Sequence, residues 1–542
     1  MRRIVTKSQS VIQVLTLGVM LAFLWLPISG QGAGGSVPLD AIGRIRQEAL
    51  EHSQIPELAE YLTDVTGPRL TGSQNIRKAQ EYAIERMKSW GVSNAHREAW
   101  GPFGRGWSLE SVAVSMTAPD FSPIIAYPKA WSPGTKGTIR GEAVFLDAST
   151  PAEVERYRGK LKGKIVLLAP ARVLKPNFEP LAERATDEEL MKLANAEPPP
   201  NPPQPFRMNA EQRARAELSI ARWQLAFDEG AAVVIEPGIK DAGTVYVTSA
   251  VIPYPVDTPD EKRAHPWDLH PPKVIPQVVV AAEQYNRMIR LINRGIPVQL
   301  EVNVAVRFHD DDAMAYNVIG EIPGTDLAGE TAMLGAPIDS WHTGTGATDN
   351  AAGAAVTLEV MRIFQELKLK PRRTVRVGIW SGEEQGRLGS RAYVAQHLAS
   401  RAAGSPAGAA ITFRPEYEGF AGYFNLDYGS GRLRGIYMQG NEAVRPAFHA
   451  WLAPLADLGC STLTIANIGA SDHISFDEVG LPGFQFIRDY MEFGTRSAHT
   501  NMDVYDHLML DDLKQSAAVA ATLLYDLAMS DRKLPRKPLA TP

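Results

Sequence analysis

Hydrophobic positions recur along this chain with two different periods. In the segments 74–90 and 350–367 they return every three or four residues, which predicts amphipathic helices that bury one face. Short β-branched runs bounded by Gly or Pro predict strands at residues 163–169, 230–238 and 275–282. Further strands are predicted at residues 331–337, 374–380, 423–427 and 482–489. From residue 315 onward strands alternate with helices, which is typical of an α/β fold with a mostly parallel sheet and helices on both faces.

The pattern changes between residues 138 and 306, where short strands and long loops predict a separate α/β or β-rich module. The run PPPNPPQP (198–205) has few amide donors and predicts an exposed excursion. Residues 252–273 form a second long loop, whose His265 and His270 are interpreted as surface or cleft-lining side chains. We expect both loops to lie over the mouth of the functional site, because loops on a rigid scaffold usually set specificity.

The first 34 residues have the layout of a secretory signal. Arg2, Arg3 and Lys7 precede an apolar stretch at 11–28, and small, flexible residues follow it. This pattern predicts an exported protein, periplasmic or secreted. The alternative is an uncleaved membrane anchor, since about 18 apolar residues come close to the length that spans a bilayer.

Composition and charge limit the partners and the metal ligands that this chain can use. The 542 residues, 44% of them apolar, allow about two to four domains. A net charge of −5 without a basic block argues against nucleic-acid binding. The single cysteine, Cys460, can form neither an intramolecular disulfide nor a cysteine-rich zinc site. Any metal must therefore be held by His, Asp and Glu.

Polar residues with suitable chemistry follow the predicted strands and helices at their ends: Asp349, Glu383, Glu384, Asp427 and His499. Carboxylates that converge at one sheet edge repel one another unless a cation binds them, so the set predicts a divalent metal. Glu383 and Glu384 leave an extended strand in different directions, so one can bind metal while the other faces an activated water. Each residue alone is explained as well by a helix N-cap or a solvated surface. Together they favour a metal hydrolase.

Five motifs extend this interpretation, and they occur in the order GAPIDSWHTGTGATDNAAGAAVTLEVMRI, WSGEEQGRLGSRAYV, FNLDYGSG, GASDHISFDEVGLPGFQFIRD and HTNMDVYDHL. The chain thereby resembles zinc metallopeptidase family 28, in its exported bacterial, carboxypeptidase Q-like or aminopeptidase forms. The middle module resembles the protease-associated (PA) domain. The resemblance implies a signal peptide at 1–34 and a three-layer α/β/α, phosphorylase/hydrolase-like zinc exopeptidase domain at 38–135 and 307–530, with a PA domain inserted at 138–306.

The resemblance also implies two zinc ions and a peptide substrate. Asp349 would bridge the two ions, Glu384 and His499 would complete one site, and Asp427 would belong to the other. Glu383 would be the general base that takes a proton from the water and passes it to the leaving amine.

One ligand that the family pattern contains is missing. A histidine ligand normally stands two residues before Asp339, and this chain has Pro337 there. The first site is left with two carboxylates, whereas tetrahedral zinc takes three protein ligands plus water. His342, five residues on, is a nearby candidate for the vacant ligand position, but related sequences carry it as well as the missing histidine, which argues against this role. Activity with one metal, weak activity and none all stay open.

Three further positions carry supporting roles by the same resemblance. Asp339 would orient a metal ligand. Asp472 and His473 would lie behind the ligands or contact substrate.

The sequence is compatible with two functions. The first is an exported zinc exopeptidase that acts on peptides or dipeptides, from the amino or the carboxyl end. The second is a catalytically inactive, peptidase-like binding protein on the same scaffold. Retention of a general base and four ligands favours the enzyme. The sequence leaves the oligomeric state open, a homodimer included, and allows membrane contact only through an uncleaved N-terminal segment.

Overall fold

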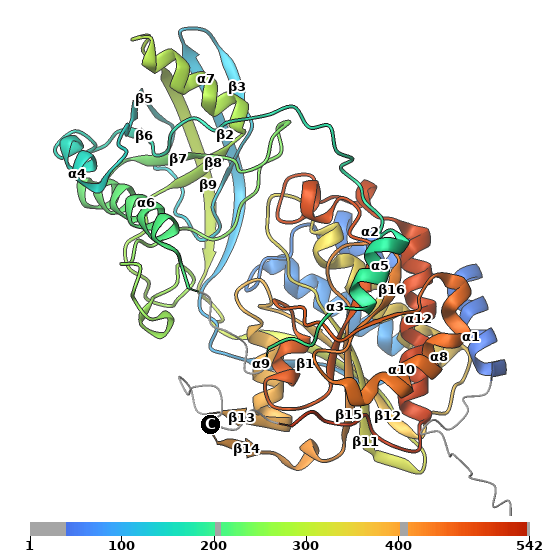
Figure 1. Cartoon of the computed structure of the whole chain (residues 1–542). Helices are drawn as coiled ribbons and strands as arrows, with labels where there is room; N and C mark the ends of the chain where they lie inside the picture. Colours follow the sequence, from blue (N-terminus) through green and yellow to red (C-terminus); the bar gives the residue numbers. More distant parts are fainter. Residues whose placement is uncertain (1–38, 201–206, 402–409, 539–542) are drawn as a thin grey trace, which may run out of the picture.

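Two domains make up the described part of the chain, each built on an eight-stranded sheet (Figure 1). The structure, a computed structural model, describes residues 39–200, 207–401 and 410–538. The predicted signal segment at 1–34 lies outside these residues. Within the described ranges no helix is long and apolar enough to cross a membrane.

The first domain contains most of the helices. Its helices are α1 (Leu39–Glu51), α2 (Ile55–Glu60), α3 (Gln74–Ser89), α8 (Ala352–Glu366), α9 (Leu388–Tyr393), α10 (Arg445–Leu452), α11 (His473–Asp477) and α12 (Leu510–Met529). Its strands are β1 (Ser93–Trp100), β10 (Ala315–Ile322), β11 (Leu327–Pro337), β12 (Arg373–Trp380), β15 (Phe420–Asn425), β16 (Leu433–Tyr437), β17 (Thr462–Thr464) and β18 (Gly483–Arg488), with a separate pair, β13 (Ala399–Arg401) and β14 (Ile411–Phe413).

The sheet of the first domain has the strand order β1-β10-β12-β11-β15-β18-β16-β17. The four central strands, β12, β11, β15 and β18, are parallel, whereas β1, β10 and β16 join by antiparallel pairs. The carboxyl ends of the parallel strands therefore meet at one edge of the sheet. Sites of parallel α/β folds form at this edge.

Helices cover both faces of this sheet. On one face Ile45 of α1, Val360 of α8 and Leu524 of α12 belong to one large core. On the other face Tyr393 of α9 and Phe476 of α11 pack in a second core. The predicted three-layer α/β/α arrangement is confirmed. The predicted helix and strands after residue 315 also form, with ends that differ by up to four residues because local periodicity marks an element's interior better than its ends.

The second domain spans residues 106–309. Its strands are β2 (Gly106–Ala118), β3 (Ser122–Ile124), β4 (Ala126–Pro128), β5 (Ile139–Phe145), β6 (Ile165–Leu167), β7 (Val233–Pro237), β8 (Gln277–Val280) and β9 (Gln299–His309). Its helices are α4 (Pro151–Val154), α5 (Asp187–Ala194), α6 (Ala210–Glu229) and α7 (Ala282–Asn293). The sheet order is β3-β2-β9-β5-β6-β7-β8-β4, with β5 to β8 parallel.

The start of this domain differs from the expected boundary. Residues 106–128 form β2, β3 and β4 of the second sheet, although the sequence predicts that 38–135 belongs to the first domain. The physical reason is the long antiparallel pairing of β2 with β9, from Gly106 opposite His309 to Ala118 opposite Gln299. A pairing between segments so far apart in sequence leaves no local signal.

The domains meet at an aromatic cluster and along an arm. The aromatic cluster contains Trp100, Phe103, Trp107, Trp131, Trp267 and Trp341. The arm, residues 181–196, leaves the second domain and lays α5 on the first, beside β16 (Figure 1). There Leu190 packs against Tyr437 and Ile487.

Candidate metal centre

Three side chains that the sequence singles out converge at the carboxyl edge of the central strands. Asp349 comes from the segment Ala347–Ala351 before α8, Glu384 from the loop after β12, and His499 from the loop between β18 and α12. The His499 Nε2 atom lies 3.0 Å from Asp349 Oδ2 and 3.1 Å from Glu384 Oε2. All three potential ligand atoms lie within 4.8 Å of one another, and no other such group of His, Cys, Asp or Glu occurs among the described residues.

The electrostatics of this group suit a cation. Burial raises the pKa of Glu384, and the charge of Asp349 adds to this effect while His499 opposes it. Burial disfavours the charged imidazole of His499, but Glu384 and Asp349 outweigh it and raise the pKa. One imidazole nitrogen and two carboxylate oxygens are a donor set that zinc accepts in catalytic sites. The residues present therefore fit a zinc ion.

Glu383 and Asp427 lie beside this group without belonging to it. The Glu383 side chain is half-buried, and its burial together with the charges of Asp427 and Asp472 raises its pKa well above the usual range. Asp427 follows β15 and accepts a hydrogen bond from the Ser471 hydroxyl at 2.5 Å. Burial and the charge of Asp349 raise the pKa of Asp427. Glu383 thus stands next to the group in a form that readily holds a proton.

Asp339 orients the two glutamates through their backbone. Its Oδ1 accepts the amide of Glu383 at 3.3 Å and its Oδ2 the amide of Glu384 at 3.2 Å. Thr71 adds a hydroxyl donor at 3.0 Å. Burial raises the pKa of Asp339 to about 6. Its contacts hold the turn after β12 rather than the side chain of a ligand.

Asp472 and His473 lie at the start of α11, and both are buried. The charge of Asp472 acts on Glu383, as the raised pKa of Glu383 records. The His473 ring donates from Nε2 to the Ile468 carbonyl at 2.9 Å, and burial lowers the pKa of His473 to about 4. Asp472 therefore lies near the centre, whereas His473 faces the 468 loop.

The position of the missing histidine is buried at the end of β11. Pro337 lies opposite Trp380 in the parallel register, and its carbonyl accepts a hydrogen bond from Asn350 at 3.2 Å. His342 does not replace it: the His342 Nε2 atom donates to the Pro128 carbonyl at 2.8 Å, and the ring packs edge-on against Trp107. Both partners belong to the second domain.

The predicted cleft loops approach the centre in part. Trp267 of the loop 252–273 lies 5.0 Å from Trp131, measured between ring centroids, and Trp131 lies 6.2 Å from Trp341. Trp341 in turn donates to Glu384 Oε2 at 2.7 Å. His265 stacks on Trp267 and is absent from the metal group. Of the proline-rich run, residues 201–206 lie outside the described residues.

Several residues of the centre were not predicted. Asp503 accepts both the amide and the hydroxyl of Thr348 and also the amide of Asp349, so it fixes the turn that carries Asp349. Burial and the charge of Asp349 raise the pKa of Asp503 to about 7. Its place four residues after His499 in the motif HTNMD was a usable signal. Trp341 and Tyr246 had none, because their contacts join segments far apart in sequence.

Comparison with known proteins agrees with this arrangement. Residues 317–524, which include all five predicted metal and base residues, match Peptidase family M28. Carboxypeptidase Q of Bos taurus is 22% identical over 512 residues, which cover 94% of this chain and 91% of that protein.

Two solved structures share the fold. The M28 peptidase precursor of Shewanella amazonensis SB2B aligns with a TM-score of 0.64 and 22% identity, over 92% of this chain and 98% of that one. The zinc aminopeptidase BSAP of Bacillus subtilis aligns with a TM-score of 0.52 and 17% identity, over 90% of this chain and 96% of that one. The part of the chain that carries this centre, residues 317–524, is therefore similar to peptidase family M28.

Proposed function

We propose that this chain is an exported zinc-dependent exopeptidase that hydrolyses peptides or dipeptides. The observation that carries the proposal is the convergence of Asp349, Glu384 and His499 beside the half-buried Glu383. Relatives that bear the names carboxypeptidase Q and zinc aminopeptidase support an exopeptidase, from either end of the peptide. The N-terminal segment 1–34 supports export.

The residues divide the work as follows. Asp349, Glu384 and His499 would hold one zinc ion, which when bound lowers the pKa of a water and polarises the scissile carbonyl. Glu383 accepts the proton of the attacking water and gives it to the leaving amine. Trp341 and Asp339 keep Glu384 in place through its side chain and its backbone.

A second candidate function follows from Pro337. With Asp349 and Asp427 as the remaining carboxylates, a second zinc would lack an imidazole ligand and bind weakly. If catalysis requires two ions, the chain would bind peptides without cleaving them. A matched assay separates the two functions.

The test compares the unmodified protein with Glu383→Gln, and with Glu366→Gln as an exposed control at the end of α8. We expect about one zinc per chain in all three, and turnover of a panel of di- and tripeptides that falls about 100-fold or more in Glu383→Gln alone. Peptide binding without hydrolysis by the zinc-loaded parent would support the binding protein. Unchanged turnover in Glu383→Gln would remove Glu383 from its role as base.

A further inference from the structure

The loop that carries His499 is held largely by the second domain. We call residues 489–501 the His499 loop; it follows β18 and lies before α12 in the chain. Two segments of the second domain contact it, residues 181–185 at the start of the arm and residues 240–247 after β7. We call these the clamping segments.

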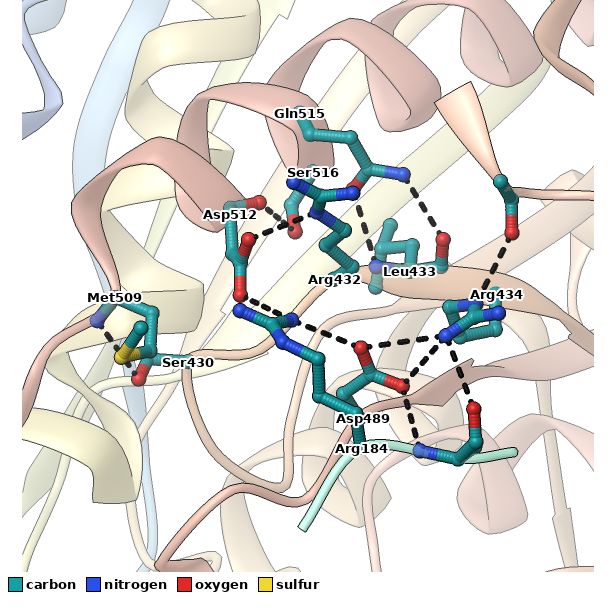
Figure 2. Close-up of polar contacts among 12 residues, drawn as sticks. Arg184, Ser430, Arg432, Leu433, Arg434, Asp489, Met509, Asp512, Gln515 and Ser516 are labelled. Atoms are coloured by element: carbon teal, nitrogen blue, oxygen red, sulfur yellow. Dashed lines mark hydrogen bonds and ion pairs between the residues drawn. The ribbon is translucent and has the colours of Figure 1, made fainter. Parts of the chain in front are cut away.

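The first clamping segment binds the start of the His499 loop through a buried carboxylate (Figure 2). Arg184 donates to Asp489 Oδ2 at 3.0 Å and contacts Asp512 Oδ2 at 2.7 Å, and both acidic side chains are almost fully buried. The Ala185 amide donates to Asp489 Oδ1 at 3.0 Å. Glu183 and Met491 exchange backbone hydrogen bonds of 3.0 and 3.3 Å. The arm therefore adds a short antiparallel bridge and an ion pair to this end of the loop.

The second clamping segment binds the end of the loop and reaches the imidazole itself. The Tyr246 hydroxyl lies 3.1 Å from His499 Nδ1, on the opposite side of the ring from the nitrogen that faces Asp349 and Glu384. The Val247 amide donates to the His499 carbonyl at 3.0 Å. The Val245 amide donates to the Asn501 side chain at 2.6 Å. One segment thus fixes both the ring and the backbone of His499.

The backbone of His499 needs such support. Its φ angle is +60°, in the left-handed region that residues other than Gly rarely adopt. Residues in this region persist where the surrounding structure holds them. Within the first domain, the Thr343 hydroxyl also donates to the His499 carbonyl, at 3.2 Å. The other donor to this carbonyl, the Val247 amide, comes from the second domain.

We propose that the second domain positions the metal ligand His499, so that zinc binding and the docking of the two clamping segments stabilise each other. Tyr246 and Arg184 are positioning residues in this arrangement. The inference rests on the zinc site proposed above. If Nε2 holds the metal, Nδ1 would carry the ring proton and would donate a hydrogen bond to the Tyr246 oxygen, which would fix the tautomer and the ring plane.

Coupling of this kind is reciprocal. A clamp that raises zinc affinity by a given factor is itself tightened by zinc by the same factor. Loss of the Tyr246 hydroxyl should weaken zinc binding about 10-fold or more, as loss of a partner behind a metal-bound histidine does elsewhere. Loss of Arg184 acts through the loop backbone and should weaken it about fivefold.

The experiment measures zinc affinity by competition with a chromophoric chelator, on the full chain. The variants are Tyr246→Phe, Arg184→Ala and Arg184→Lys. Two controls match them: Tyr157→Phe, whose hydroxyl bonds the Asp147 backbone inside the second domain, and Arg287→Ala. Arg287 pairs with Asp120 and is 41% exposed at its side chain, as Arg184 is. The absorption spectrum of the Co²⁺-loaded protein reports the ligand geometry.

We expect weaker zinc binding and an altered Co²⁺ spectrum for Tyr246→Phe, weaker binding for Arg184→Ala, and recovery in Arg184→Lys. Both controls should stay within about twofold of the parent, since distant sites do not couple. Parent-like affinity and spectrum in Tyr246→Phe, which removes one oxygen atom and leaves the fold intact, would overturn the proposal even if Arg184→Ala failed to fold. A parent that binds no zinc would instead refute the metal site, and the coupling with it.

Discussion

Replacing Arg69 with Met should destabilise the first domain, because this buried guanidinium supports the segment that leads from β11 to Asp349. Arg69 is fully buried, and it donates to the carbonyls of Ile338 and Thr345 at 2.7 Å each, of Gly346 at 2.7 Å and of Leu62 at 2.8 Å. Burial lowers its pKa to about 10, so it stays charged at neutral pH beside three acidic residues of the centre.

The size of the expected loss of stability follows from the backbone carbonyls that lose the Arg69 donor. The carbonyls of Gly346 and Leu62 keep other donors, the Ala351 amide and the Thr66 hydroxyl. The carbonyls of Ile338 and Thr345 have no second donor among the described residues. Each buried acceptor without a partner costs about 1–3 kcal/mol, so Arg69→Met should lower the free energy of unfolding by about 2–6 kcal/mol.

Urea denaturation followed by circular dichroism, with chelator present, measures this loss. Arg69→Lys keeps the charge but lacks the planar fork, so we expect an intermediate value. Arg44→Met is the control, since that exposed side chain donates to a single carbonyl, of Leu367. A loss below about 1 kcal/mol for Arg69→Met would show that the two carbonyls find other donors and that the reasoning fails.

Two further predictions concern Pro337 and Asp526. Pro337→His should raise the zinc content from about one to about two per chain and increase peptide hydrolysis, checked by metal analysis and initial rates; two tightly bound ions in the parent would contradict this ligand assignment. Asp526 of α12 has no partner for its carboxylate among the described residues, and burial raises its pKa to about 8. Because this pKa lies above the unfolded value of about 4, the protonated acid contributes stability at low pH that is lost as the pH rises towards 8. The Asp526→Asn variant should therefore have a larger free energy of unfolding than the parent at pH 8. Its free energy of unfolding should also fall less steeply between about pH 5 and 8 in a urea series, and parallel curves for the two proteins would refute the role of Asp526.

The sequence predicts the first domain well where the signal is local. The strand that ends at Trp380 and the adjacent Glu383 and Glu384 lie within one short segment, so periodicity and residue type place them together. Asp349 precedes a predicted helix in the same way, although the helix begins at Ala352 because Asp349 and Asn350 adopt non-helical backbone angles. The metal and base roles of these residues stay predictions.

Contacts between distant segments could not be predicted. Tyr246 is one aromatic residue in a loop, and its position beside His499 depends on how a whole domain docks. The same holds for His342, which looks available as a ligand in the sequence but faces Pro128 of β4. In both cases the partner is more than two hundred residues away. The pattern of residues within a short segment carries no information about contacts between such distant residues.

The aromatic cluster at the domain junction gives the protein an internal optical probe. Five of its ten tryptophans, Trp100, Trp107, Trp131, Trp267 and Trp341, lie in this cluster. One of them, Trp341, donates from its indole to Glu384. Indole emission responds to the polarity and charge around the ring, and half of the chain's tryptophans lie where the two domains and the candidate metal centre meet. Intrinsic fluorescence can therefore follow events at this junction in the unlabelled protein.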